Sequence, residues 1–313
     1  MNKVIVFDTN AYRKFVEGKD LCDINQEVDN LLSQEKENGF MAHMSTTVGE
    51  ELISHMKDDP ESRSFKSCLK AVQAIYRHTG DAKAFRLLPL PETQLAMEFF
   101  GVANLKSINV QQVVGNVLFH IAQNPIQATI KKFDSEIQQV INYVDGAEQA
   151  LANEVEGMMK NIDPNYSEWT LFKDDEKNRK EWLNYVRTNA KFETALALLV
   201  ALCNDLENQG IKMKVYSKEE IKIQVNHYMT SYAAPLELRQ YWMDQLVGHF
   251  DLTKDSRSNF LWDERILHQA GHSINGVPIM LVTSDGKMKE CAKKANPSCE
   301  IVTYTEYMQL LNN

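Results

Sequence analysis

The chain opens with Met1-Asn2-Lys3-Val4-Ile5-Val6-Phe7-Asp8-Thr9-Asn10. Its apolar part, Val4 to Phe7, is rich in β-branched and aromatic side chains, which is typical of a strand buried on both faces in a parallel sheet covered by helices. Asp8 then stands at the carboxyl end of the strand, the edge at which open α/β sheets bind ligands. A carboxylate at this place is either a metal ligand or a polar cap on the next helix.

The end of the chain repeats this pattern. Pro278-Ile279-Met280-Leu281-Val282-Thr283-Ser284-Asp285-Gly286 is a second apolar run that closes on a carboxylate and a turn. Strand order in a parallel sheet can bring Asp8 and Asp285 side by side, and two such carboxylates repel each other unless a cation lies between them. Considered alone, an aspartate before a glycine, as at Asp285, is more often a turn residue.

Composition narrows the class of protein. The chain has 313 residues, of which 43% are hydrophobic, enough for a full core in one or two domains. No apolar stretch approaches the ~20 residues of a membrane span. Five cysteines without a CxxC pair favour reduced thiols in a cytoplasmic protein. The net charge of −9 argues against binding of nucleic acid by overall electrostatic attraction, so any such contact must use a local basic surface.

The first 56 residues predict a βαβα unit. Helices are expected over residues 11–16 and 25–37, and a second strand over residues 40–45. Thr47-Val48-Gly49-Glu50 matches a capping box, which would place Glu50 in the first turn of the next helix.

Residues 57–249 carry almost no strand signal, and helical periodicity dominates. Helices are expected over residues 61–79, 108–122, 126–159, 176–208 (one long helix or a kinked pair), 217–232 and 235–249, and Ser217 to Glu220 forms a second capping box. Alternation returns with a helix at 259–270, a strand at 279–283, a helix at 287–294, a strand at 299–303 and a helix at 305–311. The sequence therefore predicts a discontinuous α/β domain, residues 1–56 and 250–313, interrupted by a helical insertion, residues 57–249.

Four acidic positions fall where such a sheet can gather them: Asp8 and Asp285 after strands, Glu50 or Glu51 at the start of the third helix, and Asp263 early in the helix before the Asp285 strand. Hard divalent cations such as Mg²⁺ or Mn²⁺ prefer oxygen ligands. Three or four carboxylates leave metal positions open for a phosphate and an attacking water, which is the arrangement of metal-assisted phosphodiester hydrolysis. By itself, Asp263 is more typical of a solvated charge near a helix N-terminus.

Four segments taken together resemble the PIN-domain nuclease family. They are the Asp-Thr-Asn strand at Val4–Asn10, the Glu-Leu helix start at Ser45–Leu52, the Asp-x-x-Ile-x-x-x-Ala helix at Asp263–Ala270, and the Leu-Val-Thr-x-Asp strand at Leu281–Asp285. The resemblance covers only the two ends of the chain. The Glu and the third acid are also much farther apart here than in a compact member of that family.

The resemblance implies a Rossmann-like parallel sheet, Mg²⁺ or Mn²⁺, and endoribonuclease activity in preference to cleavage of DNA. Carried over by position, Asp8, Glu51 (with Glu50 as the alternate), Asp263 and Asp285 would be the catalytic, metal-binding residues. Asn10 and Thr283 would orient those carboxylates. It leaves room for a protein regulator of the antitoxin kind and for self-association, with no membrane role.

Two groups of basic residues are candidates for nucleic-acid contact. Arg63, Lys66, Lys70 and Arg77 are spaced 3, 4 and 7 apart and share the polar face of an amphipathic helix, which is otherwise simply a solvated face. Lys287, Lys289, Lys293 and Lys294 follow Asp285 directly.

The preferred interpretation is a metal-dependent endoribonuclease acting on single-stranded RNA, with the helical insertion controlling substrate access. One alternative is a nuclease of the same fold that acts on DNA or on structured junctions. The other is a catalytically silent PIN-like module that binds a protein partner.

Overall fold

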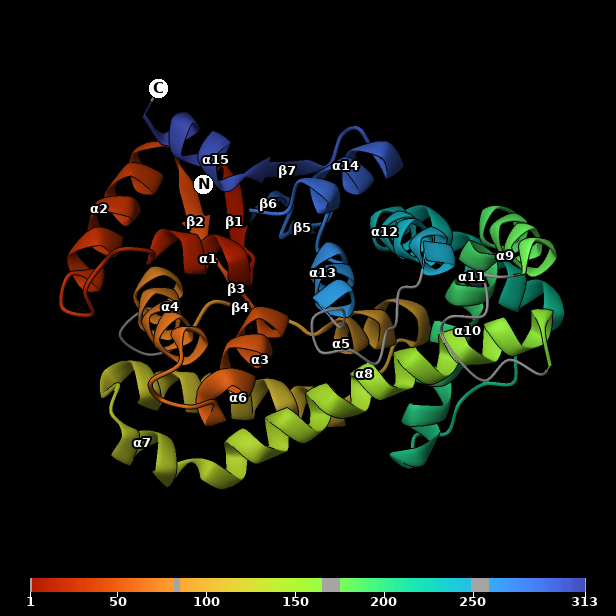
Figure 1. Ribbon diagram of the computed structural model, residues 1–313, viewed down its shortest axis with the longest axis horizontal. Helices are drawn as coiled ribbons and strands as arrows, with labels where there is room; N and C mark the ends of the chain where they lie inside the picture. The colour runs from red at the N-terminus through yellow and green to blue at the C-terminus, as the bar shows by residue number, and fades with distance from the viewer. Residues whose placement is uncertain (1, 81–84, 165–174, 249–258, 313) are drawn as a thin grey trace.

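A computed structural model of the chain describes residues 2–80, 85–164, 175–248 and 259–312. The protein is mixed α/β, mainly helical, with a small and mostly parallel sheet (Figure 1). The sheet has the order β2-β1-β6-β7, all parallel, with β5 antiparallel to the start of β6. Its strands are β1 (Lys3–Phe7), β2 (Phe40–Ala42), β5 (Ser273–Ile274), β6 (Val277–Thr283) and β7 (Glu300–Thr303).

The two ends of the chain meet in the centre of this sheet. β1 pairs with β6 in parallel, with Val4 opposite Ile279 and Phe7 opposite Val282. The predicted adjacency of the two Asp-bearing strands is thus confirmed. Chain connections leave this pair in opposite directions, β1 toward β2 and β6 toward β7. The crevice between two such strands is the topological switch point at which open α/β sheets bind ligands.

Helices cover both faces of the sheet. Right-handed crossovers place α2 (Ile24–Glu37) and α14 (Gly286–Ala295) on opposite faces, because β1 to β2 and β6 to β7 run in opposite directions along the sheet. The last helix, α15 (Tyr304–Leu311), lies on the α2 side, where the Tyr307 hydroxyl donates a 2.6 Å hydrogen bond to Glu35 on α2.

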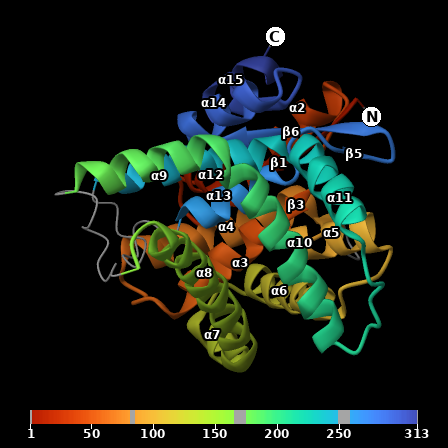
Figure 2. The ribbon, with the colours of Figure 1, turned by 90° about the vertical axis from the view of Figure 1, so that its right-hand side faces the viewer.

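The remaining helices build the larger part of the molecule. In chain order they are α1 (Thr9–Phe15), α3 (Thr46–Ser54), α4 (Arg63–Thr79), α5 (Pro91–Leu95), α6 (Leu105–Gln123), α7 (Gln127–Lys132), α8 (Asp134–Ile162), α9 (Glu176–Thr188), α10 (Ala190–Asn208), α11 (Lys218–Ser231), α12 (Ala233–Gln245) and α13 (Asn259–Leu267). Short 3₁₀ turns cover His55–Lys57 and Leu246–Gly248, and a π turn covers Ala96–Phe100. The long helix α8 runs from beneath α3 and α6 toward α9 and α10 (Figure 1), and α8 to α11 come to the front in Figure 2.

Several predicted elements are confirmed, and others are corrected. The single strand expected at 40–45 is split, because Phe40–Ala42 pairs with β1 whereas β3 (Met44–Ser45) pairs with β4 (Leu87–Leu88). The helix expected at 126–159 is two helices, α7 and α8, and residues 176–208 form the pair α9 and α10. The capping box at Ser217 is present.

The predicted capping box at Thr47 is wrong. The helix begins earlier, at Thr46 with Ser45 as its N-cap, and no side chain caps it. Glu50 and Glu51 therefore lie in the second turn. At that position the Glu50 side chain cannot reach back to the first amides, and it turns into the protein interior instead.

The helical block packs directly on the α/β part. One continuous cluster of buried side chains includes Val6 of the sheet as well as Val114 and Trp182 of the block. A second cluster, which includes Leu95, Tyr228 and Leu236, lies wholly within the block. The predicted division into a core and an insertion stays a prediction, and its second boundary, at residues 249 and 250, lies outside the described residues. No described helix has the length and apolar character needed to cross a membrane.

Candidate functional site

Asp8 sits at the switch point between β1 and β6. Its backbone amide donates to the Val282 carbonyl at 2.9 Å, which continues the β1–β6 pairing by one residue. Its side chain is 2% exposed and caps α1 by accepting a 2.5 Å hydrogen bond from the Ala11 amide. The capping role considered from the sequence is therefore present, and it leaves the second carboxylate oxygen facing β6.

Thr283, the last residue of β6, joins the two strand ends. Its hydroxyl donates to the second Asp8 oxygen at 2.5 Å and accepts from the Asp285 amide at 2.8 Å. One buried hydroxyl thus orients Asp8 and fixes the backbone that carries Asp285. The contact is compatible with the orienting role predicted for Thr283, which stays a prediction.

Asp285 is the N-cap of α14. One carboxylate oxygen accepts from the amides of Lys287 and Met288, at 2.6 and 3.0 Å. Asp285 is thus also a capping residue, as the simpler interpretation of the sequence allowed. The other predicted orienting residue, Asn10, is exposed in the first turn of α1.

The two candidate glutamates on α3 turn to different surroundings. Glu51 accepts a 2.5 Å hydrogen bond from the Thr9 hydroxyl at the start of α1, which places it on the Asp8 side. Glu50 is fully buried and lies 3.8 Å from the guanidinium of Arg265 on α13. The geometry therefore favours Glu51 over Glu50 as the fourth member of the acidic group.

Asp263 comes to the same place from α13. Burial raises its pKa well above the usual value, and the nearby carboxylates of Asp285, Asp8 and Glu51 raise it further. Asp285 follows β6, Asp8 follows β1 and Glu51 lies on α3, so the Asp263 carboxylate is within electrostatic range of all three. We call Asp8, Glu51, Asp263 and Asp285 the acidic edge.

Burial raises the pKa of two other members of the acidic edge. Burial, opposed by the hydrogen bonds from Thr283 and Ala11 and assisted by the charge of Glu51, raises the pKa of Asp8 to about 7. Burial also raises the pKa of Glu51, although the Thr9 hydrogen bond and the charge of Arg13 oppose it. Among the described residues, no ion pair joins any of these four carboxylates to a Lys, Arg or His side chain, although the charge of Arg13 partly offsets that of Glu51.

The chemistry of this donor set suits Mg²⁺ or Mn²⁺, because all the donors are carboxylate oxygens. The spacing is wider than one ion requires: within the part of the chain that the structure describes, no three His, Cys, Asp or Glu side chains stand close enough together to hold a metal. For a cation to bind three of these carboxylates, the side chains of the acidic edge would have to move closer to one another than they lie in the structure.

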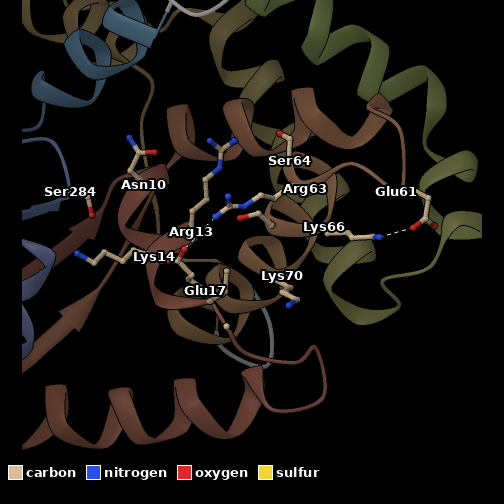
Figure 3. A pocket seen from close by; sticks show the side chains of 13 residues that line it. Asn10, Arg13, Lys14, Glu17, Glu61, Arg63, Ser64, Lys66, Lys70 and Ser284 are labelled. Carbon is tan, nitrogen blue, oxygen red and sulfur yellow. Dashed lines mark hydrogen bonds and ion pairs between the residues drawn. The ribbon is translucent and has the colours of Figure 1, made fainter.

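A basic pocket of about 930 Å³ opens beside the acidic edge (Figure 3). It lies between α1 and α4, and its lining includes Asn10 and Ser284, which are neighbours in sequence of members of the acidic edge. The cations around it are Arg13, Lys14, Arg63, Lys66 and Lys70. Three of the four predicted α4 cations therefore line a pocket next to the carboxylates.

The other predicted cations lie elsewhere or are engaged. Arg77 forms a two-pronged ion pair with Asp29 on α2, at 2.7 and 3.0 Å, and does not line the pocket. The lysines after Asp285 each have an acceptor: Lys287 pairs with Glu290, Lys289 with Glu306, Lys293 with the Cys299 carbonyl and Lys294 with Glu237.

Sequence reasoning missed two residues on α1. Thr9 stands inside the Asp-Thr-Asn motif, but only the helical turn that follows directs its hydroxyl to Glu51. Arg13 is four residues after Thr9, so the two share one face of α1. That i,i+4 spacing was the available signal, and it acquires meaning only once α1 is known to pass the acidic edge.

No family model matches this chain, and neither does any curated protein or solved structure. The resemblance to PIN domains therefore rests on the residues and their placement.

Proposed function

We propose that this protein is a metal-dependent nuclease with a Rossmann-like, PIN-like core, and that it cleaves single-stranded RNA internally. The observation that carries the proposal is the acidic edge. Asp8 and Asp285 follow β1 and β6 at the switch point of the parallel sheet, Glu51 and Asp263 approach from α3 and α13, and no described cation forms an ion pair with any of the four. Burying like charges together costs free energy, and an external cation is the simplest compensation.

The residues divide the work as follows. Asp8, Glu51, Asp263 and Asp285 would hold Mg²⁺ or Mn²⁺, while the Thr283 and Thr9 hydroxyls keep the Asp8 and Glu51 carboxylates oriented. When bound, the metal lowers the pKa of a water and stabilises the leaving oxygen. The cations of the basic pocket would hold the phosphates of the strand beside the scissile bond.

The protein's own charge bears on substrate choice. With a net charge of −9, binding must rely on the basic pocket, which is one local surface. A flexible single strand can bend into such a pocket more easily than a stiff duplex. RNA rather than DNA follows from the family resemblance.

A cleavage assay tests the proposal. Labelled single-stranded RNA, single-stranded DNA and duplex are incubated with the protein in Mg²⁺, Mn²⁺ or EDTA. We expect metal-dependent internal cleavage of the single-stranded RNA and none by Asp263→Asn. The exposed Glu207→Gln on α10 is the matched control and should cleave like wild type. Cleavage of DNA or of duplex alone would overturn the proposed substrate but keep the nuclease. Cleavage in EDTA would overturn the metal-dependent mechanism.

A catalytically silent module that binds a protein partner is the second candidate. The observation in its favour is that no three ligating side chains among the described residues stand within reach of one ion. Titration with Mn²⁺ decides between the two. If neither melting temperature nor cleavage responds to the metal, the silent module is the better description.

A further inference from the structure

The basic pocket has a direction. It starts at Asn10 and Ser284, next to the acidic edge, and extends along α1 and α4 as far as Glu61, Lys66 and Lys70. Figure 3 shows Asn10, Arg13 and Lys14 projecting from α1 and Glu17 from the turn just after it, with Arg63, Ser64, Lys66 and Lys70 of α4 opposite. A strand whose scissile phosphate lay at the acidic edge would therefore find cations on one side of that phosphate.

Most cations of the pocket already have a partner. Arg63 pairs with Glu17 at 3.4 Å and Lys66 with Glu61 at 2.6 Å, both on the exposed surface. Lys70 donates to the Lys19 carbonyl. Exposed ion pairs of this kind contribute ~0–1 kcal/mol and exchange readily for a phosphate.

Arg13 is different. Within the described part of the chain, its one hydrogen bond is from Nη2 to the thiol of Cys68, at 3.1 Å, and its buried Nε has no hydrogen-bond partner there. No described carboxylate forms an ion pair with it, and its side chain is only partly exposed. A thiol is a weak acceptor for a guanidinium, whose planar fork matches a phosphate or carboxylate. Arg13 lines the pocket and is partly exposed, so, as far as the described residues go, its Nη donors other than the one to Cys68 remain free for a phosphate there.

The opposite flank offers nothing comparable. There the described lysines after Asp285 are committed to Glu290, Glu306, Glu237 and a backbone carbonyl. Lys287 also lies over the Tyr241 ring at 4.3 Å. The difference between the two flanks is a difference in free cationic donors.

We propose that Arg13 anchors a backbone phosphate of the nucleic-acid strand on the α1–α4 side of the acidic edge, so that the protein holds its substrate from one side only. The inference rests on the proposed nuclease function for the position of the scissile phosphate. It adds a named phosphate-binding residue, Arg13, and a prediction of which side of the cleavage site contributes to binding. Phosphates on the pocket side of the cleavage site contribute to affinity, and those on the other side contribute little.

The first test is binding without cleavage. A fluorescein-labelled 12-mer of single-stranded RNA is titrated with the protein in EDTA at several salt concentrations, and its anisotropy is followed. We expect Arg13→Ala to weaken binding about tenfold and to lower the salt slope by about 0.7, the value for one contact to a single strand. Arg13→Lys keeps the charge without the fork and should fall between the two. Arg187→Ala, an exposed arginine on α9, is the matched control.

Three results would overturn the inference: wild type that does not bind the 12-mer, Arg13→Ala that binds like wild type, or Arg187→Ala that weakens binding equally. A thermal melt of each variant guards against loss of fold. If Arg13→Ala has a lower melting temperature than wild type, the test uses Arg13→Lys instead, because lysine keeps the positive charge. Its affinity for the 12-mer is then measured by competition with unlabelled RNA, and an affinity equal to that of wild type would overturn the inference.

The second test concerns polarity and separates this inference from the proposed function. Substrates with a fixed cleavage site are shortened one nucleotide at a time from either end. We expect KM to rise steeply from one end only, and equal dependence on both ends would overturn the one-sided model while cleavage itself stood. Conversely, a protein that never cleaves but whose binding depends on Arg13 would keep the phosphate anchor and reject the nuclease.

Discussion

Helices α3 and α13 each carry charged side chains in two different surroundings. Glu51 and Asp263 belong to the acidic edge, and no described Lys, Arg or His side chain forms an ion pair with either. Their neighbours Glu50 and Arg265 face the interior, where the Arg265 guanidinium lies 3.8 Å from Glu50 and donates to Glu92 at 2.5 and 3.0 Å. Glu264, next to Asp263 in sequence, likewise accepts a hydrogen bond from the buried Arg239 at 2.8 Å.

On the proposed function, the difference separates structural from metal-binding acids. Glu264 and Glu92 accept hydrogen bonds from buried arginines, which hold these carboxylates in place, whereas Glu50 only lies near the Arg265 charge and burial raises its pKa to about 8. Asp263 instead lies among other carboxylates, whose charges raise its pKa further, and this suits it to an external cation. Adjacent residues on the same helix turn, such as Glu50 and Glu51, can thus have unrelated roles.

The largest expected effect comes from breaking the interior side. Arg265→Met removes a buried cation and leaves Glu92 and Glu50 without it, so we expect the free energy of unfolding to fall by about 3–5 kcal/mol. Urea denaturation followed by circular dichroism measures the change. Arg187→Met on the surface of α9 is the control and should shift it little. A loss below about 1 kcal/mol at Arg265 would mean that the ion pairs do not hold α13 in place.

A substitution in the acidic edge should lower activity without lowering stability. Asp8→Asn removes an anionic ligand and should lower the cleavage rate at least about 100-fold, equivalent to about 2.7 kcal/mol. In EDTA it should melt at or above the wild-type temperature, because it relieves repulsion and asparagine can still cap α1. Thermal melts with and without Mn²⁺ measure both halves. A variant that melts far below wild type in EDTA would assign Asp8 a capping role only.

The same two proteins test the pH dependence. The pKa of Asp8 is raised to about 7 in the folded protein from an ordinary value of 3.8. Between these pH values the folded state binds more protons than the unfolded state, so this contribution to stability is complete below about pH 4 and is lost as the pH rises to about 7. The stability of wild type in EDTA, relative to Asp8→Asn, should therefore decrease over that range. A constant difference would contradict the raised pKa.

The adjacent glutamates of α3, Glu50 and Glu51, should differ in their effect on the cleavage rate. Glu51→Gln should lower the cleavage rate about 30-fold, or about 2 kcal/mol. Glu50→Gln should leave the rate near that of wild type, because burial raises the pKa of Glu50 to about 8 and its neutral form resembles glutamine. Initial rates in saturating Mn²⁺ are the measurement. The reverse result would make Glu50 the ligand.

The smallest effect is expected at the hydroxyl that joins the strand ends. Thr283→Val keeps the shape but removes both the donor to Asp8 and the acceptor for the Asp285 amide. Loss of such an orienting contact typically costs at least about tenfold in metal affinity or activity, and we expect a change near that lower limit. Isothermal titration with Mn²⁺ gives the affinity. Thr283→Ser, which keeps the hydroxyl, should behave like wild type, and equal losses in both variants would point to packing.

Local sequence determined most of the secondary structure. Val4 to Phe7 has no polar residue, so it had to be a buried strand, and the periodic helices of the central block followed from one-sided apolar spacing. The capping box at Ser217 is complete within four residues and was readable as such. Placing the acids after strands and early in α13 likewise required only neighbouring residues.

Tertiary contacts decided the rest. Residues 40–45 look like one strand, but their two halves pair with different partners, β1 and β4, which are far apart in the chain. The sequence preferred Glu51 and kept Glu50 as the alternate; only the tertiary structure shows that Glu50 faces Arg265 while Glu51 faces Thr9. The adjacency of β1 and β6, the bond from Thr9 to Glu51 and the unused donors of Arg13 all join segments that the sequence holds apart. Local preference sets what each segment becomes, whereas only packing sets which charges meet.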